Sequence, residues 1–436
     1  MDIFEDLKWR GLLSDYTRFA ESEHDAADKA PQLPDLLNHK PVTLYCGFDP
    51  TADSLHVGSL VPLIALRRFQ LAGHHPIAVA GGATGSIGDP SGKTQERQLL
   101  TAAHIKANVD AIKPQLARLL DFETTTNPAR LVDNADWFGP ITFIDFLRDV
   151  GKHFTVNQMV AKESVRARME DREVGISYTE FSYMLLQAYD FAHLNQVFGC
   201  ELQIGGSDQW GNITAGIDLI RKKHRKQGYG LTLPLITKAD GTKFGKTESG
   251  TIWLDAKRTS VYQFYQFWIN TDDRDVLKYL RYFTLLPKEQ IEALDAAHSA
   301  DPGKREAHRA LATAMTALLH GESACTAAVQ ASAILFGGAV DDITAETLSI
   351  LRSEVPGKAI PREQLETGMQ LLEAMVQAGL SNSKGNARKD LEGGGVYVNG
   401  QRITDVQRQL KTEDLLHGEG VLLRKGKRAY AVISVA

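Results

Sequence analysis

The hydrophobic residues near the start of the chain form an ordered pattern. A short apolar run begins at Thr43 behind Pro41 and breaks at Gly47 and at Asp49 and Pro50, and apolar residues then recur with helical spacing from Leu60 to Leu66. This pattern predicts a buried strand, a tight turn and the start of a helix. It also predicts that His56 lies about one turn into that helix, where backbone N–H groups and the helix dipole favour a phosphate.

Two later segments that resemble strands each lead into a pair of glycines. The run at 76–80 leads into Gly81 and Gly82, and the run at 202–204 leads into Gly205 and Gly206. Both runs are typical of buried strands, whereas residues 100–175 have a mostly helical pattern. Strands that alternate with helices predict an α/β, Rossmann-like parallel-sheet domain whose ligands lie at the carboxyl ends of the strands.

The pattern changes twice further along the chain and so divides it into domains. We expect a Rossmann-like parallel-sheet domain at 1–254 and, where the periodicity becomes helical, an α-helical domain at 255–351. Residues 352–362 contain two prolines and a glycine, and this composition predicts a linker. A small α+β domain is expected at 363–436.

Composition excludes several classes of protein. The chain of 436 residues is 43% apolar and 24% charged, with a formal charge of −5, which is typical of a globular protein and not of a general nucleic-acid coat. Its three cysteines lie far apart, so the sequence predicts neither a disulfide framework nor a cysteine zinc site. The N-terminus lacks a signal-peptide pattern and no run is long enough for a membrane span, so we expect a cytoplasmic protein.

The glycine-rich segment at 81–94 resembles a P-loop in composition only. That motif needs glycine at position 87, where the chain has Ile87, and the dinucleotide-binding pattern is also absent. Two interpretations remain open. The segment is either a loop shaped by glycines or a functional turn with a carboxylate, Asp89, and a nearby cation, Lys93.

A helix predicted over 181–190 carries three polar side chains on one face. Tyr183, Gln187 and Asp190 are spaced i, i+4 and i+7. Such a face is either solvated or the wall of a pocket, and the many apolar neighbours favour the pocket. The turn after 202–204 carries Asp208, which suits ribose or adenine because glycines allow close approach and a carboxylate accepts hydrogen bonds from hydroxyls.

Basic residues suggest two further sites. Lys243 and Lys246 lie at i and i+3 on a glycine-containing loop, which is either a charged surface turn or a loop that closes over a polyphosphate. Near the C-terminus, a predicted helix carries Lys384, Arg388 and Lys389 on one side. Because the C-terminal segment has little net charge, any attraction for RNA must come from this placement.

Three motifs resemble those of one family. Residues 47–59 resemble the first signature of class I aminoacyl-tRNA synthetases, although Ser59 stands where the signature usually has a second His. Residues 243–247, Lys-Phe-Gly-Lys-Thr, resemble the second signature. Residues 381–389 and 395–400 resemble a small RNA-binding module named after a small-subunit ribosomal protein. Over essentially its whole length the chain is similar to bacterial tyrosyl-tRNA synthetases.

The resemblance implies a tyrosine–tRNA ligase. Such an enzyme activates L-tyrosine with ATP to tyrosyl-adenylate plus pyrophosphate, and then transfers tyrosine to the 3′-terminal ribose of tRNA(Tyr). The resemblance also implies a homodimer and ATP used with Mg²⁺, while no bound structural metal is expected. Because the tyrosine carboxylate is already a nucleophile, activation needs in-line positioning and charge stabilisation, and no general base.

The resemblance assigns roles to individual residues. The groups expected to be catalytic, by holding the polyphosphate and the leaving pyrophosphate, are Thr51, His56, Lys243, Lys246 and Thr247, together with Lys93 and Arg97. The groups expected to meet adenosine are Cys46, Gly47, Asp49, Gly206 and Asp208. The substrate ammonium would be held by Asp89, Tyr183 and Gln187, with Gln209 near the carboxylate. Tyr45 and Asp190 would hold the phenolic hydroxyl.

Three alternatives are weighed against this interpretation. A tryptophanyl-type synthetase has a related architecture but is expected to lack the Tyr45 and Asp190 pair in this context. A catalytically idle RNA-binding relative would keep the fold, and the intact lysines of the second signature argue against it. A small-molecule nucleotidyltransferase would hardly need the C-terminal RNA module.

Overall fold

The computed structural model describes residues 2–19, 30–91, 100–162, 165, 166, 169, 175–242, 244–247 and 250–435. The chain divides into two compact units. Unit 1 consists of Met1–Thr259 with Thr271–Ala307, and unit 2 consists of Ser260–Asn270 with His308–Ala436. None of the described helices is both long and apolar enough to cross a lipid bilayer.

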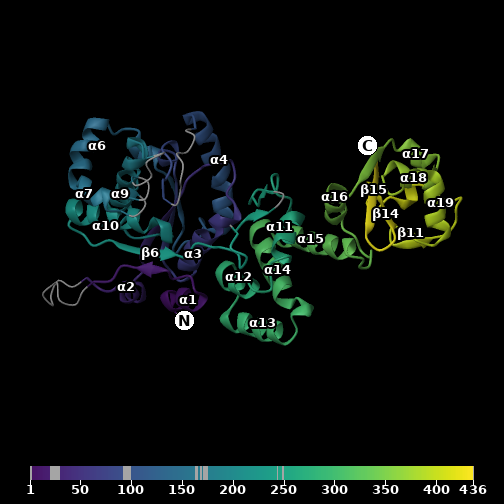
Figure 1. Ribbon diagram of the computed structural model, residues 1–436, viewed down its shortest axis with the longest axis horizontal. Coiled ribbons are helices and arrows are strands. Elements are labelled where there is room, and N and C mark those ends of the chain that lie inside the picture. Colours follow the sequence, from purple (N-terminus) through teal and green to yellow (C-terminus); the bar gives the residue numbers. More distant parts are fainter. Residues whose placement is uncertain are drawn as a thin grey trace. The chain divides into compact units, whose positions relative to one another are not determined.

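Unit 1 is built on a six-stranded sheet in the order β1-β6-β5-β2-β3-β4. Figure 1 labels β6 and several of the helices of this unit. All neighbouring pairs are parallel except β1 with β6. The strands are β1 Asp15–Tyr16, β2 Thr43–Phe48, β3 His75–Ala80, β4 Arg130–Asp133, β5 Cys200–Gly206 and β6 Tyr229–Leu233. The parallel α/β sheet predicted from the sequence is confirmed, and β4 is a strand within the region predicted to be mostly helical.

Strand β2 lies at the centre of this sheet. It pairs with β3 on one side, where Tyr45 faces Ile77, and with β5 on the other, where Tyr45 faces Gln203. The chain therefore leaves β2 toward β3 and later returns to the opposite neighbour, β5. Ligands of open α/β sheets bind where the strand order reverses in this way.

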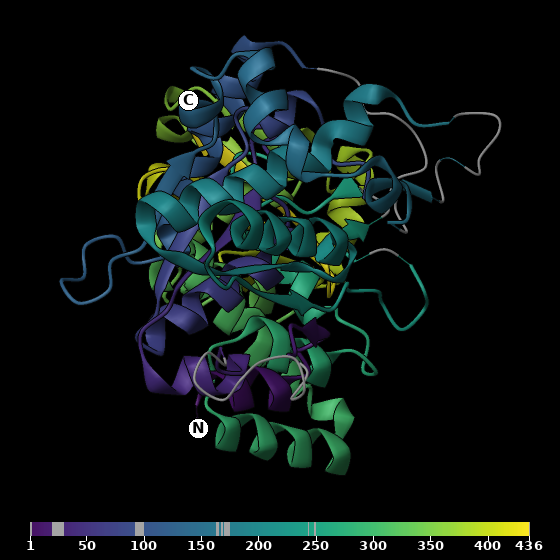
Figure 2. The same ribbon diagram turned by 90° about the vertical axis from the view of Figure 1, so that its left-hand side faces the viewer.

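Helices cover the sheet of unit 1. Helix α3 packs on β2 and β3, whereas α9 and α10 pack on β5 and on each other. Helices α9 and α10 are labelled in Figure 1, and their part of the chain is teal in Figure 2. Among the residues that the structure describes, unit 1 contains the helices α1 Ile3–Arg10, α2 Leu33–His39, α3 Leu60–Leu71, α4 Ala102–Leu119, α5 Ala135–Phe138, α6 Phe143–Asp149, α7 Val156–Val160, α9 Tyr178–Phe198, α10 Trp210–His224, α12 Val276–Phe283 and α13 Lys288–Ala300. Helix α9 starts where the Ser177 side chain accepts from the Glu180 N–H, and it ends at Gly199 in the left-handed region.

The expected position of His56 within a helix is wrong. A short 3₁₀ turn, η1 Val57–Ser59, precedes α3, and His56 is the extended residue before it. Its backbone forms an isolated bridge with Trp253, and its Nδ1 accepts a hydrogen bond of 3.0 Å from the Gly58 N–H. The long-range bridge holds His56 extended, and local periodicity could not reveal it.

Unit 2 contains helices and an α+β module. Its helices are α11 Val261–Ile269, most of α14 Glu306–His320, α15 Glu322–Leu335, α16 Ala345–Glu354, α17 Glu363–Glu366, α18 Leu371–Gln377 and α19 Lys384–Glu392. A five-stranded sheet has the order β12-β11-β14-β15-β9, from β9 Gly357–Ile360, β11 Val396–Val398, β12 Gln401–Ile403, β14 Gly420–Lys425 and β15 Ala429–Val435. A second pair joins β10 Met369–Gln370 to β13 Gln409–Leu410. The predicted α+β character is confirmed.

The segment predicted as a linker, 352–362, is built into this module. Its first residues end α16, and β9 pairs in parallel with β15 at the edge of the sheet. Pro356 and Pro361 flank β9, a position that an edge strand tolerates. Leu351 of α16 also shares one hydrophobic cluster with Leu422 of the sheet. The prolines therefore mark the ends of a strand, while the domain boundaries themselves stay a prediction.

Candidate functional site

A cavity of about 370 Å³ lies at the carboxyl ends of β2 and β5. This is the switch point of the sheet, where the strand order predicts a ligand. Its wall combines aromatic, amide and carboxylate side chains with glycine backbone. The lining residues are Tyr45, Cys46, Gly47, Phe48, Asp49, Pro62, Val79, Gly81, Thr84, Asp89, Ser91, Asn134, Tyr183, Gln187, Asp190, Gln203, Ile204, Gly205, Gly206, Asp208, Gln209 and Leu235.

One part of the cavity wall is formed by Asp190 and Tyr45. Asp190 is 5% exposed, and its two carboxylate oxygens accept hydrogen bonds from Trp137 Nε1 at 2.8 Å and Asn134 Nδ2 at 3.1 Å. The Tyr45 hydroxyl is buried and has no hydrogen-bond partner among the residues that the structure describes. A buried hydroxyl beside a cavity costs free energy unless a ligand supplies its partner. This wall is therefore suited to a ligand hydroxyl.

Burial also perturbs the protonation of these groups. It raises the pKa of Asp190 from 3.8 to about 8, against the opposing effect of the Asn134 and Trp137 donors. Burial, and then the charge of Asp190, raise the pKa of Tyr45 well above its ordinary value. Without a ligand, the cavity therefore disfavours negative charge on Asp190 and on Tyr45. A ligand that donates a hydrogen bond to Asp190 favours the carboxylate form of this side chain.

We predict that the titration of Asp190 makes the free energy of unfolding decrease as the pH rises. Between its ordinary pKa of 3.8 and about 8, native Asp190 holds a proton that the unfolded chain has released, so the free energy of unfolding decreases with pH over this interval. The Asp190→Asn variant lacks this proton. Chemical denaturation at about pH 5 and at about pH 8 measures the free energy of unfolding at each pH. Between the two, this free energy should fall less in the variant than in the parent protein. Equal losses for both proteins would contradict the prediction.

Two further carboxylates line the cavity. The oxygens of Asp49 accept hydrogen bonds from the Tyr183 hydroxyl at 3.1 Å and the Thr84 hydroxyl at 3.0 Å. Asp89, 9% exposed, accepts from Gln209 Nε2 at 2.6 Å and from the Ser91 N–H at 2.9 Å. The two printed donors to Asp89 are neutral and hold its carboxylate in place without cancelling its charge. The site can therefore attract a ligand cation such as an ammonium group.

Amide side chains extend this network from α9 to the following helix. Gln187 Nε2 donates to Gln209 Oε1 at 3.2 Å, and Asn212 Nδ2 donates to Gln187 Oε1 at 3.0 Å. The predicted positions Asp89, Tyr183, Gln187 and Gln209 thus lie on one cavity, as the shared helix face of α9 suggested.

The predicted adenosine positions also line the cavity. Cys46 and Gly47 come from the end of β2, and Gly206 and Asp208 follow β5. A Cβ atom on Gly206 would lie 2.5 Å from Asp208 Oδ1, so only glycine leaves this carboxylate where it stands. Asp49 is shared, because its carboxylate also accepts from Tyr183.

The predicted phosphate-binding residues are only partly visible. Thr51 and His56 are exposed and do not line the cavity itself. Lys93, Arg97 and Lys243 lie outside the described residues, as do the side chains of Lys246 and Thr247. The backbone of the last two forms β7 Lys246–Thr247, which pairs with β8 Gly250–Thr251.

The sequence analysis missed several side chains at the site. Asn134 and Trp137 follow β4 and hold Asp190, while Thr84 joins Asn134 to Asp49 through hydrogen bonds of 2.9 and 3.0 Å. Gln203 is 2% exposed, lines the cavity, and has a side-chain oxygen without a hydrogen-bond partner among the described residues. An amide inside an apolar strand was the one available signal for Gln203.

The candidate RNA-binding residues lie in unit 2. Lys384, Arg388 and Lys389 are all exposed on α19. Lys384 forms an ion pair of 3.3 Å with Glu373, and both side chains are largely exposed. A weak surface pair of this kind leaves the lysine available to a phosphate.

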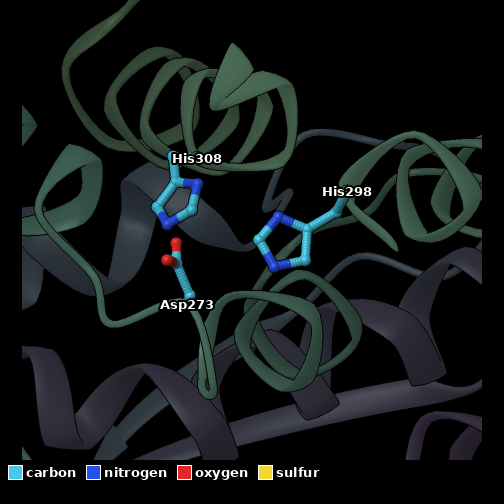
Figure 3. Close-up of side chains that lie close together, drawn as sticks. All are labelled: Asp273, His298 and His308. Carbon is cyan, nitrogen blue, oxygen red and sulfur yellow. The ribbon is translucent and has the colours of Figure 1, made fainter. Parts of the chain in front are cut away.

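Figure 3 shows three residues with metal-ligating side chains away from this cavity, Asp273, His298 and His308. Asp273 precedes α12 and His298 lies on α13, both in unit 1, and their ligand atoms are within 4.8 Å of each other. His308 is a buried residue of unit 2. All three have interaction partners in the protein. Two side chains of one unit are fewer than a structural zinc site needs, so we assign no metal to them.

Comparisons with known proteins are consistent across the chain. A model of the family "tRNA synthetases class I (W and Y)" matches residues 37–337, and a model of the "Tyrosine--tRNA ligase SYY-like C-terminal domain" matches residues 352–433. The tyrosine–tRNA ligase of Opitutus terrae is 56% identical over 436 residues, which is all of both chains. That of Geobacillus stearothermophilus is 54% identical over 438 residues, again all of both chains.

Solved structures show the same similarity in three dimensions. A C-terminally truncated mitochondrial tyrosyl-tRNA synthetase of Aspergillus nidulans has 31% identity and a TM-score of 0.68, over 77% of this chain and 94% of that one. The Archaeoglobus fulgidus tyrosyl-tRNA synthetase, solved with L-tyrosine, has 18% identity and a TM-score of 0.52, over 74% of this chain and 99% of that one. The second likeness shows the fold alone.

Proposed function

The chain belongs to the tyrosyl-tRNA synthetase family of class I enzymes, and from this premise we propose that the unit 1 cavity binds tyrosine with its phenolic hydroxyl between Asp190 and Tyr45. The activity itself is that of a tyrosine–tRNA ligase, whose substrates are tyrosine, ATP and tRNA. The observation that carries the proposal is the buried Tyr45 hydroxyl, which lacks a partner among the described residues beside the buried Asp190.

The rest of the cavity then receives the remainder of the amino acid. The substrate ammonium would lie against Asp89 and Tyr183 with Gln187, and Gln209 would face the substrate carboxylate. The neutral hydrogen bonds that hold Asp89 support this placement, because they leave its negative charge for the ammonium. Adenosine would lie along Cys46, Gly47, Asp49, Gly206 and Asp208 at the ends of β2 and β5.

The activation of tyrosine is then a nucleophilic displacement at the α-phosphorus of ATP. A carboxylate oxygen of tyrosine forms a bond to the α-phosphorus of ATP, the bond to the bridging oxygen breaks, and pyrophosphate leaves with that electron pair. We propose that Thr51, His56, Lys93, Arg97, Lys243, Lys246 and Thr247 stabilise the charge on the transferring and leaving phosphates. ATP would enter as its Mg²⁺ complex, with the ion held by phosphate oxygens.

Transfer follows from the same bound adenylate. The hydroxyl oxygen of the terminal tRNA ribose attacks the tyrosyl carbonyl carbon, AMP leaves with the electron pair of the anhydride bond, and the hydroxyl proton is released. Lys384, Arg388 and Lys389 of α19 would contact tRNA phosphates, since all three are exposed on one helix. Because the enzyme acts on tRNA, we also propose that it is located in the cytoplasm.

Pyrophosphate–ATP exchange without tRNA, measured with all twenty amino acids in parallel, tests the proposal. We expect exchange with tyrosine alone, because only the phenol satisfies both Tyr45 and Asp190. Exchange with tryptophan would mean that the pair binds something other than a phenol. Absence of exchange from protein that still binds tRNA would contradict the assignment of the cavity.

We also propose that the enzyme is a homodimer, joined through α6 and α7. These helices expose large apolar side chains, with Phe143 63%, Ile144 69% and Val156 64% exposed. Exposed apolar groups of this size are typical of an interface. We predict that Phe143→Asp combined with Ile144→Asp gives monomers in sedimentation velocity.

Leu71→Asp is the matched control for the dimer prediction. Leu71 is 61% exposed but lies on α3, away from α6 and α7 in the sequence, so its replacement should leave the dimer intact. A parent protein that sediments as a monomer, or a double variant that stays dimeric, would refute the interface.

A further inference from the structure

Helix α12 holds the segment that carries the second signature. Asp275 Oδ2, at the start of α12, accepts a hydrogen bond of 2.8 Å from the Ala239 N–H. One turn later, Lys278 Nζ donates to the Thr237 carbonyl at 3.1 Å. The segment is therefore attached to α12 just before the signature begins.

The second signature itself packs against the carboxyl-terminal half of the same helix. The ring of Phe244 stacks on that of Phe283, with centroids 5.1 Å apart and an interplanar angle of 18°. Its edge contact with Tyr279 also has a centroid distance of 5.1 Å. Phe244 is thus packed against two consecutive turns of α12, and the residues before and within the signature share one support.

Asp275 is used in an unusual way. It is the N-cap residue of α12, where an aspartate normally accepts from the first backbone N–H groups of its own helix. Here the side chain makes no capping hydrogen bond, although it is only 2% exposed. It bonds Ala239 and forms an ion pair of 2.9 Å with Lys278. Its carboxylate therefore joins the attached segment, through Ala239, to a side chain of α12, Lys278.

The segment also touches the first signature. Gly245 has a φ of +79°, and a Cβ atom there would lie 2.7 Å from Val57 Cγ2. The Gly245 carbonyl accepts from the Ile252 N–H at 3.0 Å, and the Ile252 carbonyl accepts from the Val57 N–H at 3.1 Å. A shift of the segment would therefore change its distance from the turn that follows His56.

The carboxyl end of α12 is also bound to α3, the helix that follows the first signature. Arg68 of α3 donates to the carbonyls of Arg281 and Thr284, and Arg10 of α1 donates to the same two carbonyls. Asp6 forms ion pairs with both arginines. Cations at the carboxyl end of a helix match its dipole, so α12 is held firmly against α3.

We propose that Asp275 is a positioning residue for the binding of ATP. Its carboxylate holds the Ala239 N–H, and this contact fixes the position of the second signature relative to the first through α12. This inference rests on the proposed role of the two signatures in binding the phosphates of ATP. Asp275 touches neither substrate in this scheme. Its effect should be specific to ATP, because its contacts are to the segment 237–245 and not to the tyrosine cavity.

Steady-state pyrophosphate exchange tests this specificity. Asp275→Ala should lower kcat/KM for ATP about tenfold, the effect of losing one hydrogen bond to a charged group, with KM for tyrosine unchanged. Asp275→Asn keeps an acceptor for Ala239 and should recover most of the loss. Asp295→Ala is the matched control, since Asp295 pairs with Arg281 on α12 at 3.1 Å without touching the segment.

The effects of Asp275→Ala and Phe244→Leu on kcat/KM for ATP should also be less than additive, because both variants release the same segment. Hydrogen exchange of the amides at 237–242 provides a readout independent of catalysis, and it should be faster in Asp275→Ala than in Asp295→Ala. Unchanged exchange in this segment, or an equal loss for tyrosine and ATP, would overturn the inference. Absence of activity in the parent would instead count against the proposed function, while the amide measurement would still decide the role of Asp275.

Discussion

Replacing Asp190 by alanine is expected to lower kcat/KM for tyrosine about 100-fold, while KM for ATP stays within about twofold. The variant removes the buried acceptor for the phenol and leaves the Trp137 and Asn134 donors without their partner. Hydrogen bonds to charged groups contribute about 1.5–3 kcal/mol, and a buried unpaired donor adds a similar cost. Pyrophosphate exchange at varied tyrosine and ATP concentrations measures both quantities.

Trp137→Phe provides a graded control for this prediction. It keeps an aromatic ring beside His193, on which Trp137 stacks with centroids 4.6 Å apart, but removes only one of the two donors to Asp190. We expect a loss of about tenfold for tyrosine. If Asp190→Ala has unchanged tyrosine kinetics, or a smaller effect than Trp137→Phe, the phenol does not bind at Asp190.

Replacing Asp89 by asparagine is expected to have a similarly large effect, raising KM for tyrosine by about 30- to 100-fold. The amide has nearly the shape of the carboxylate, so the variant mainly removes the charge that would attract the substrate ammonium. An asparagine nitrogen facing Gln209 Nε2 would also oppose the present 2.6 Å hydrogen bond. Tyrosinol, which keeps the ammonium but lacks the carboxylate, should lose inhibitory strength to the same extent.

Asp208→Asn is the reciprocal control for Asp89→Asn. Asp208 is exposed at the rim of the cavity, and its proposed partner is the adenosine of ATP. We expect it to raise KM for ATP and to leave KM for tyrosine nearly unchanged. If both variants weaken the same substrate, the two ends of the cavity have been assigned in the wrong order.

Local patterns predicted the strands of the catalytic sheet well. Strand β2 spans Thr43–Phe48 and so contains the predicted apolar run together with Gly47, and the glycine pairs after the other two predicted strands mark the carboxyl edge of the sheet. A buried strand needs apolar side chains along its whole length, and glycine allows the turn that follows. The helix face with Tyr183, Gln187 and Asp190 was equally readable, because helical spacing depends only on the sequence itself.

Patterns that depend on distant partners were misread. His56 has the sequence context of a helix start, but its bridge to Trp253 keeps it extended before a 3₁₀ turn. The prolines around 357–360 suggested a linker, but they flank an edge strand that pairs with β15. In both cases a partner some 75 to 200 residues away in the chain sets the local conformation, as is common where tertiary contacts override local preference.

The sequence by itself determined the class of fold and three strands of the catalytic sheet, since periodicity is a local property, and its motifs named half of the residues that line the cavity. Only the tertiary structure decided how those side chains are held. Asn134 and Trp137 reach Asp190 because β4 and α5 pack beside α9, and Asp275 reaches Ala239 because α12 packs along the second-signature segment. Such hydrogen bonds join residues that are far apart in the chain, so their geometry exists only once the sheet and its helices have assembled.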